Sequence, residues 1–158
     1  MDSYRTEIRR FVIALNRIDG MYYQIAKTFG VKDNFVYLLY ALDDGKPHSQ
    51  KQICDEWLIP RTTINTIVRE YVQKGYITLL HTDHSREKRI LLTDSGRKYA
   101  QQLLQKIYDA EESAMADTIA AFDNGFIAAV EQFADSLQHH VPGCTSKNQE
   151  TEDDILHE

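Results

Sequence analysis

The segment that most constrains the fold of this chain is a pair of short helices joined by a tight connector. Residues 49–52, SQKQ, form a Ser-x-x-Gln capping box and predict the start of a helix that runs to about Trp57. Residues 58–60 are the connector, and Pro60 suits the first turn of the next helix, where a missing N–H costs nothing. That second helix ends at Gly75, a helix-stopping residue. Helix, tight turn and helix predict a helix-turn-helix.

After the second helix, the sequence changes from a helical pattern to β-prone runs. The runs ITLLHT (77–82) and RILLT (89–93) are β-prone, and the polar segment DHSREK (83–88) lies between them. Two such runs around a charged tip predict a β-hairpin. A helix-turn-helix followed by a hairpin is the layout of a winged helix-turn-helix.

Helices are also predicted on the N-terminal side of this segment. Apolar residues recur at helical spacing over 3–28, with Gly30 as the stop and Gly20 as a candidate kink. A shorter helix is expected over 34–43, with Asp33 as its N-cap.

Two further helices are predicted on the C-terminal side. Thr93 is the expected N-cap of a long helix that starts at Asp94, and a last helix holds the apolar residues between positions 126 and 137. The expected fold class is therefore mainly α with a small β-hairpin wing (α+β), a winged helix-turn-helix flanked by long terminal dimerisation helices. The expected parts are an N-terminal dimerisation helix (1–30), a DNA-binding domain (31–98), C-terminal dimerisation helices (99–143) and a disordered acidic tail (144–158).

The net charge of −6 argues at first against a nucleic-acid partner, but its distribution does not. Residues 1–45 carry six basic and six acidic side chains, residues 46–98 carry ten and six, and residues 99–158 carry two and twelve. The middle of the chain is therefore basic between a neutral arm and an acidic end. Local clustering of positive charge matters for phosphate contacts more than the total does.

The second helix of the pair has two contrasting faces. One face is an apolar stripe at helical spacing, made of Ile64, Ile67, Val68, Tyr71 and Val72. The opposite face holds only arginine, threonine and asparagine: Arg61, Thr62, Thr63, Asn65, Thr66 and Arg69. These side chains suit guanine, the thymine methyl and adenine, whereas an ordinary solvated face more often mixes Glu and Lys. From this helix alone, the face is either a plain solvated surface or one that reads DNA.

Three blocks of the chain resemble the MarR family of bacterial transcription regulators, over about Val31 to Tyr99. The blocks are SQKQICDEWLIPRTTINTIV, REYVQKGYI and SREKRILLTDSGRKYA, whose matching positions are Tyr71, Gly75, Ile77, Arg86, Leu92, Thr93 and Gly96. One departure concerns the wing tip, where the family usually has Asp two residues before the arginine. Here His84 holds that place, and Asp83 lies one residue earlier.

The resemblance implies a sequence-specific, double-stranded DNA-binding transcription regulator, a homodimeric repressor that a small-molecule ligand releases from a pseudo-palindromic operator. The chemistry of the residues agrees with this implication. The N-terminus of the helix that follows the SQKQ capping box, together with Lys51, suits a phosphate, and the wing tip suits the minor groove. The expected DNA-binding residues are Ser49, Gln50, Lys51, Arg61, Thr62, Thr63, Asn65, Thr66, Arg69, His84, Arg86 and Lys88. The alternative is a winged-helix protein-interaction module without DNA binding.

The terminal helices predict a homodimer, because they carry more apolar positions than a small winged domain can cover: Phe11, Leu15, Ile18 and Tyr22 at one end, Phe126, Val130, Phe133 and Leu137 at the other. The resemblance implies a small aromatic or anionic effector in a crevice beside these helices. Candidate effector-binding residues are Tyr22, Tyr23, Phe35 and Tyr40, with Phe29 and Tyr37 nearby in sequence. The same aromatics at helical spacing also fit a plain core.

Other classes of function find little support in the sequence. No apolar run approaches the roughly 20 residues of a membrane span, and no signal-peptide core is present. The six histidines form no ligand-spaced cluster, so neither a metal nor another cofactor is expected, and no catalytic motif indicates an enzyme. Cys54 and Cys144 form no framework, so reduced thiols in the cytoplasm are expected, with Cys54 as a small buried residue.

Overall fold

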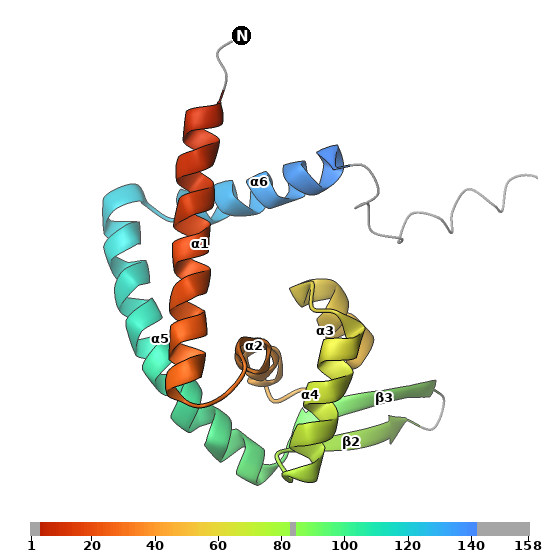
Figure 1. The fold of residues 1–158 in the computed structure, drawn as a ribbon. Helices are drawn as coiled ribbons and strands as arrows, with labels where there is room; N and C mark the ends of the chain where they lie inside the picture. Colours follow the sequence, from red (N-terminus) through yellow and green to blue (C-terminus); the bar gives the residue numbers. More distant parts are fainter. Residues whose placement is uncertain (1–3, 83–84, 142–158) are drawn as a thin grey trace, which may run out of the picture. The chain divides into compact units, whose positions relative to one another are not determined.

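The computed structural model describes residues 4–82 and 85–141, with the backbone alone at 82 and 85–87. The prediction of a disordered tail, together with Cys144, falls outside these ranges. The elements, in chain order, are α1 (Arg5–Thr28), α2 (Asp33–Leu42), β1 (His48–Ser49), α3 (Gln50–Trp57), α4 (Arg61–Gln73), β2 (Ile77–Thr82), β3 (Ser85–Leu92), α5 (Asp94–Phe122) and α6 (Gly125–His140) (Figure 1). A mainly helical fold with a small antiparallel sheet is confirmed.

The chain divides into two compact units, Met1–Ala110 and Glu111–Glu158, and α5 runs through both. The first unit has an aliphatic core that α2, α3, α4, the sheet and the start of α5 share, with Leu38, Leu42, Ile64, Ile90 and Leu104 completely buried. The second unit has no buried residue in α6, whose apolar side chains stay partly open to solvent.

The wing is a three-stranded antiparallel sheet in the order β1-β3-β2. The hairpin register pairs Ile77 with Leu92 and Leu79 with Ile90. The two-residue strand β1 is not predicted by the sequence analysis; it pairs His48 with Ile90 and the following serine with Arg89. This pairing attaches the start of α3 directly to the wing.

Capping explains where α3 begins and how α4 is entered. The Ser49 hydroxyl accepts a hydrogen bond from the Gln52 N–H at 3.0 Å, as the capping box predicts. Leu58 then turns the chain in the left-handed region (φ 51°), and Pro60 is the N-cap of α4 instead of a residue in its first turn. Its ψ of 137° is an extended value, and this holds Pro60 outside the helix.

Two other boundaries also differ from the predictions. Asp33 is the first residue of α2 and Lys32 is its N-cap; the Asp33 carboxylate accepts a hydrogen bond from the next backbone N–H at 2.9 Å. Strand β3 begins at Ser85 instead of residue 89, because its backbone pairs with β2 as far as Ser85, opposite Thr82. Helix α1 runs without a break through Gly20.

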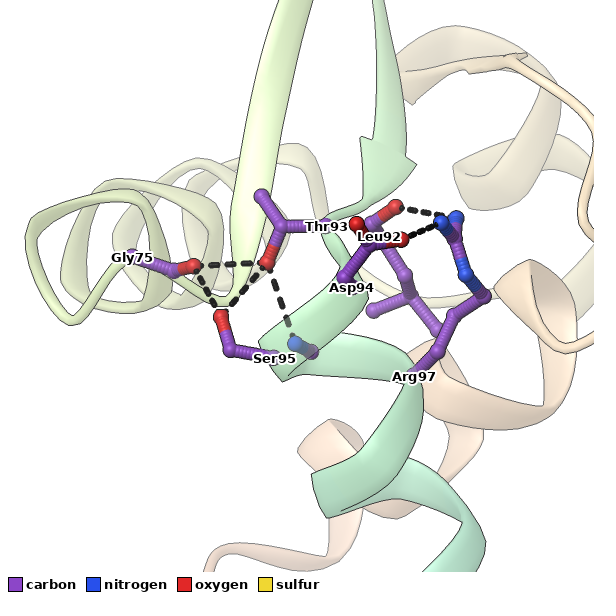
Figure 2. Close-up of polar contacts among 7 residues, drawn as sticks. Gly75, Leu92, Thr93, Asp94, Ser95 and Arg97 are labelled. Atoms are coloured by element: carbon purple, nitrogen blue, oxygen red, sulfur yellow. Dashed lines mark hydrogen bonds and ion pairs between the residues drawn. The ribbon is translucent and has the colours of Figure 1, made fainter.

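A polar junction joins the end of α4 to the start of α5 (Figure 2). The Thr93 hydroxyl caps α5 by accepting the Gly96 N–H at 3.0 Å, as predicted, and it also donates to the Gly75 carbonyl at 2.7 Å. The Ser95 hydroxyl donates to the same carbonyl. Gly75 supplies the positive φ (76°) that stops α4. A side chain at Gly96 would collide with the backbone carbonyl of Tyr76, so this close approach requires glycine.

Candidate nucleic-acid interface

Helix α4 presents its polar face to solvent and its apolar face to the core. Ile64, Ile67, Val68 and Tyr71 are buried, whereas Arg61, Thr62, Asn65, Thr66 and Arg69 are exposed and Thr63 is half-buried. The Thr66 hydroxyl donates back to the Thr62 carbonyl at 2.9 Å. An exposed row of guanidinium, amide and hydroxyl groups on one helix matches what base edges and phosphates need.

Three elements meet around a hollow beside this face. The hollow has a volume of about 270 Å³ and is lined by Gln50 and Lys51 from α3, Arg61 and Asn65 from α4, Lys88 from β3, and Cys54. Five of these six residues are expected DNA contacts that lie far apart in sequence. The β1–β3 pairing explains their meeting, because it fixes the start of α3 against the strand that carries Lys88.

The charge around the hollow is positive. Among the described residues no carboxylate lines it. The ion pairs of the described residues use Asp44 with His48, Glu70 with Lys74, and Asp94 with Arg97. The cations of Lys51, Arg61 and Lys88 therefore face solvent without a carboxylate partner from the described chain, as phosphate binding requires.

One polar atom of the hollow lacks a partner. The Gln50 side-chain oxygen is buried, and within residues 4–82 and 85–141 no group donates a hydrogen bond to it. Such a buried acceptor is costly unless a donor reaches it.

Cys54 is buried under this hollow, as the sequence analysis predicted. Its side chain is 7% exposed, and burial raises the pKa of its thiol, which keeps it protonated and unreactive. The Ser49 hydroxyl is engaged as the cap of α3 and is therefore less available to a phosphate than the N–H groups around it.

A second hollow on the other flank of α4 shows a residue that the sequence analysis missed. It has a volume of about 280 Å³ and is lined by Lys32 together with Thr62, Thr63, Thr66 and Ile67. Lys32 lies 30 positions before Thr62, and no local motif marks it. Only the packing of α2 against α4 brings its charge to this surface.

The wing tip cannot be compared with the predictions in the same way. The side chains of His84 and Arg86 lie outside the described residues. Lys88 is described and belongs to strand β3. We therefore retain His84 and Arg86 as predictions from the sequence.

The four candidate effector residues do not form one lining. Phe35 is 1% exposed and stacks on Tyr71 in the core, whereas Tyr23 is 57% exposed on α1. Tyr22 and Tyr40 are half-buried, and Tyr22 packs against Tyr37 with ring centroids 6.1 Å apart.

Two other features concern metal binding and membrane helices. No group of three or more histidine, cysteine or acidic side chains with the geometry of a metal site occurs in the part of the chain that the structure describes. Likewise, none of the helices over residues 4–82 and 85–141 combines the length and apolarity needed to cross a membrane.

Comparison with known proteins agrees with this arrangement. Residues 29–87 match the family model described as MarR family, and the sequence matches no curated protein. A MarR family regulator from Neisseria meningitidis has a similar structure, with 20% sequence identity, a TM-score of 0.70, and coverage of 88% of this chain and 96% of that chain.

Two structures from S. aureus are similar as well. MepR in a DNA complex shares 19% identity with a TM-score of 0.65, over 87% of this chain and 100% of that chain. MarR in complex with salicylate and kanamycin shares 14% identity with a TM-score of 0.68, over 87% and 93%. At these identities the likeness is one of fold. This chain therefore contains a segment, residues 29–87, that matches the MarR family, within a fold similar to that of these solved structures.

Proposed function

We propose that this protein is a transcription regulator that binds double-stranded DNA sequence-specifically, as a homodimeric repressor that a small molecule releases. The observation that carries the proposal is the hollow beside α4, where Lys51, Arg61 and Lys88 gather around Gln50 and Asn65. Cations anchor the phosphates, and the two amides are suited to base edges. The MepR–DNA complex is a solved structure of this fold bound to DNA.

In the proposed complex, the exposed face of α4 enters the major groove. Asn65 and Arg61 lie in the N-terminal half of α4, the part of a recognition helix that contacts base edges. Lys51 and the first turn of α3 hold the phosphates of the same groove. The wing, with Arg86 and His84, extends the contact towards the minor groove.

A homodimer supplies a second copy of α4, which can bind a second half-site in the DNA. Each unit of the chain exposes an apolar surface that it does not cover itself: Val12, Leu15 and Ile18 on α1, and Val130, Phe133 and Leu137 on α6. Exposed apolar surface of this extent marks an interface in a soluble protein. We propose that both surfaces pair in an isologous dimer, which reads a pseudo-palindromic operator with half-sites about one helical turn apart.

Release by a small molecule is the regulatory part of the proposal. The S. aureus MarR structure of this fold holds salicylate and kanamycin. In this chain, Tyr22 on α1 and Tyr40 on α2 are half-buried, so each keeps part of its ring open to a ring-bearing ligand. A ligand there would bias the position of α2 and α3, which support α4.

The alternative is a winged-helix protein-interaction module, for which the net charge of −6 is the main argument. The two functions are separated by a gel-shift titration with the duplex upstream of the protein's own gene, at low and at raised salt. A DNA-binding regulator shifts this duplex at low salt, and its affinity for the duplex falls steeply as the salt concentration rises. No shift with any duplex at low salt would refute the proposal, and sedimentation of the same sample reports whether a dimer forms.

A further inference from the structure

The outward face of α4 has two flanks, and a hollow lies on each of them. The positive hollow takes Arg61 and Asn65 from α4. The hollow on the other flank takes Thr63 and Thr66 from α4, together with Lys32 from the start of α2. Successive residues of an α-helix are about 100° apart around its axis, so Arg61 and Thr63 are separated by about 160°. The two hollows therefore lie on opposite sides of α4.

A closed turn between α1 and α2 fixes where Lys32 lies. Gly30 follows α1 with a positive φ of 67°, and its N–H donates to the Lys27 carbonyl at 3.0 Å. The Val31 N–H donates to the Ala26 carbonyl, also at 3.0 Å. These two bonds form a Schellman motif, which sets the direction of the chain beyond the helix. Lys32 comes next as the N-cap of α2, and α2 packs against α4.

The ammonium group of Lys32 is free to bind a ligand. Lys32 is exposed, and none of the ion pairs within residues 4–82 and 85–141 includes it. The Asp33 carboxylate is engaged with the Asn34 N–H of its own helix at 2.9 Å.

The other carboxylate on this flank belongs to Glu70, which lines a neighbouring hollow with Lys32 and Lys74. Glu70 accepts a hydrogen bond from Lys74 at 2.7 Å. That bond, with a smaller contribution from the charge of Lys32, holds the pKa of Glu70 below its usual range. Glu70 and Lys74 thus neutralise each other, and the charge of Lys32 is left uncompensated.

We propose that Lys32 binds a backbone phosphate of one DNA strand, while Lys51 and Lys88 bind phosphates of the other strand. The major groove is about 12 Å wide, and a helix with its side chains is about 10–12 Å across. A helix that fills the groove therefore has a different strand at each flank. The Thr63 hydroxyl, in the same hollow as Lys32, is a second donor for that phosphate. This inference rests on the proposed function and deepens it, because it adds a contact that holds α4 at both edges of the groove.

The salt dependence of DNA binding measures the proposed contact. Lys32→Ala should lower the slope of log affinity against log salt by about 1 and weaken binding about fivefold to tenfold near ~100 mM salt. Phosphate contacts carry no sequence information, so the duplex from upstream of the gene and a scrambled duplex should lose affinity alike. The lysine side chain makes no capping bond to α2, so alanine should leave the fold intact.

Two further variants are the controls for this measurement. Lys27→Ala removes the same charge from the last turn of α1, at a residue that lines neither hollow, and should behave as the wild type. Lys32→Arg retains the charge and should keep the wild-type slope. A slope in Lys32→Ala equal to that in Lys27→Ala would overturn the inference.

Neutral phosphates identify the strand that each lysine contacts. A set of duplexes would each carry one uncharged methylphosphonate within a single half-site. A position that weakens the wild type but not Lys32→Ala marks the phosphate that Lys32 binds, and the same comparison with Lys51→Ala marks the phosphate of Lys51. The inference predicts that the two phosphates lie on different strands. Two phosphates on the same strand, or no such position for Lys32→Ala, would contradict it.

These results separate the inference from the proposed function. A wild type that binds DNA, with a Lys32→Ala variant of unchanged affinity and slope, refutes the Lys32 contact and leaves the regulator standing. A wild type that binds no duplex at low salt refutes both.

Discussion

The Thr93 hydroxyl and the Gly75 carbonyl oxygen lie 2.7 Å apart and form a hydrogen bond across 18 positions of sequence (Figure 2). This bond connects the residue that ends α4 to the residue that caps α5. The same hydroxyl accepts the Gly96 N–H, so one side chain fixes both the start of α5 and its distance from α4. The junction is therefore the point where α4 and the long α5 helix hold each other in place.

Thr93→Val should destabilise the protein measurably. The substitution keeps the shape but removes the cap and the bond to Gly75, at a cost of about 1–2 kcal/mol. A melting curve should shift down by about 2–8 °C. Thr118→Val is the matched control, because its hydroxyl only bonds back to the Ala114 carbonyl within α5; a shift as large in the control would contradict the role of the junction.

Gly96→Ala should be far more damaging than its single methyl group suggests. The added Cβ would strike the Tyr76 carbonyl, which belongs to the backbone and cannot turn aside. We expect a loss of stability of about 3 kcal/mol or more, or failure to fold. Gly20→Ala provides the comparison: nothing lies within 4 Å of its added Cβ, and alanine in a helix should stabilise by about 0.5–1 kcal/mol. Denaturant unfolding of both variants tests the pair, and a mild Gly96→Ala would show that α5 can shift away from Tyr76.

Asn65→Ala should alter sequence preference more than general affinity for DNA. Its amide lies at the hollow where base edges are expected, so its loss should cost about 1–3 kcal/mol on the preferred site and little on a scrambled duplex. Lys51→Ala and Lys88→Ala should instead weaken binding to all sequences and lower the slope of log affinity against log salt by about 1 each. Lys27→Ala, in the last turn of α1, is the control. Anisotropy titrations with both duplexes check this division, which an unchanged preference in Asn65→Ala would contradict.

Tyr37 should contribute to the loss of stability in alkali. Burial, with the hydrogen bond to Asp19, raises the pKa of Tyr37 to about 12, whereas a phenol in an unfolded chain titrates near ~10. The native state keeps a proton that the unfolded chain releases, so this contribution is complete below pH ~10 and is lost as the pH rises towards 12. Melting temperatures measured across this window should fall less steeply in Tyr37→Phe than in the wild type. Equal slopes would show that the phenol is not held in its protonated form.

The sequence predicted those parts of the fold that depend on local signals. Ser49 and Thr93 are caps in the structure because a hydroxyl three residues before a free N–H needs no tertiary help. The inward face of α4 is also as predicted, because its apolar spacing has one solution on a helix.

The misplaced features depend on contacts between distant segments. The β1 strand exists only because His48 and its neighbour find β3 some 40 positions later. Lys32 reaches the flank of α4 through the packing of α2, which no local pattern encodes. Phe35 lies at helical spacing with Leu38, Leu39 and Leu42 and is buried with them, whereas Tyr37 and Tyr40 lie off that stripe and are half-buried.

The central claim is that the positive hollow beside α4 binds DNA, and salt dependence of DNA binding tests it most directly. The duplex from upstream of the protein's own gene and a scrambled duplex would be titrated at about 50 mM and about 200 mM salt. With six or more phosphate contacts, we expect tight and selective binding at the lower concentration and a loss of about a thousandfold or more at the higher one. Binding that is absent from every duplex at low salt, or that does not change with salt, would contradict the account.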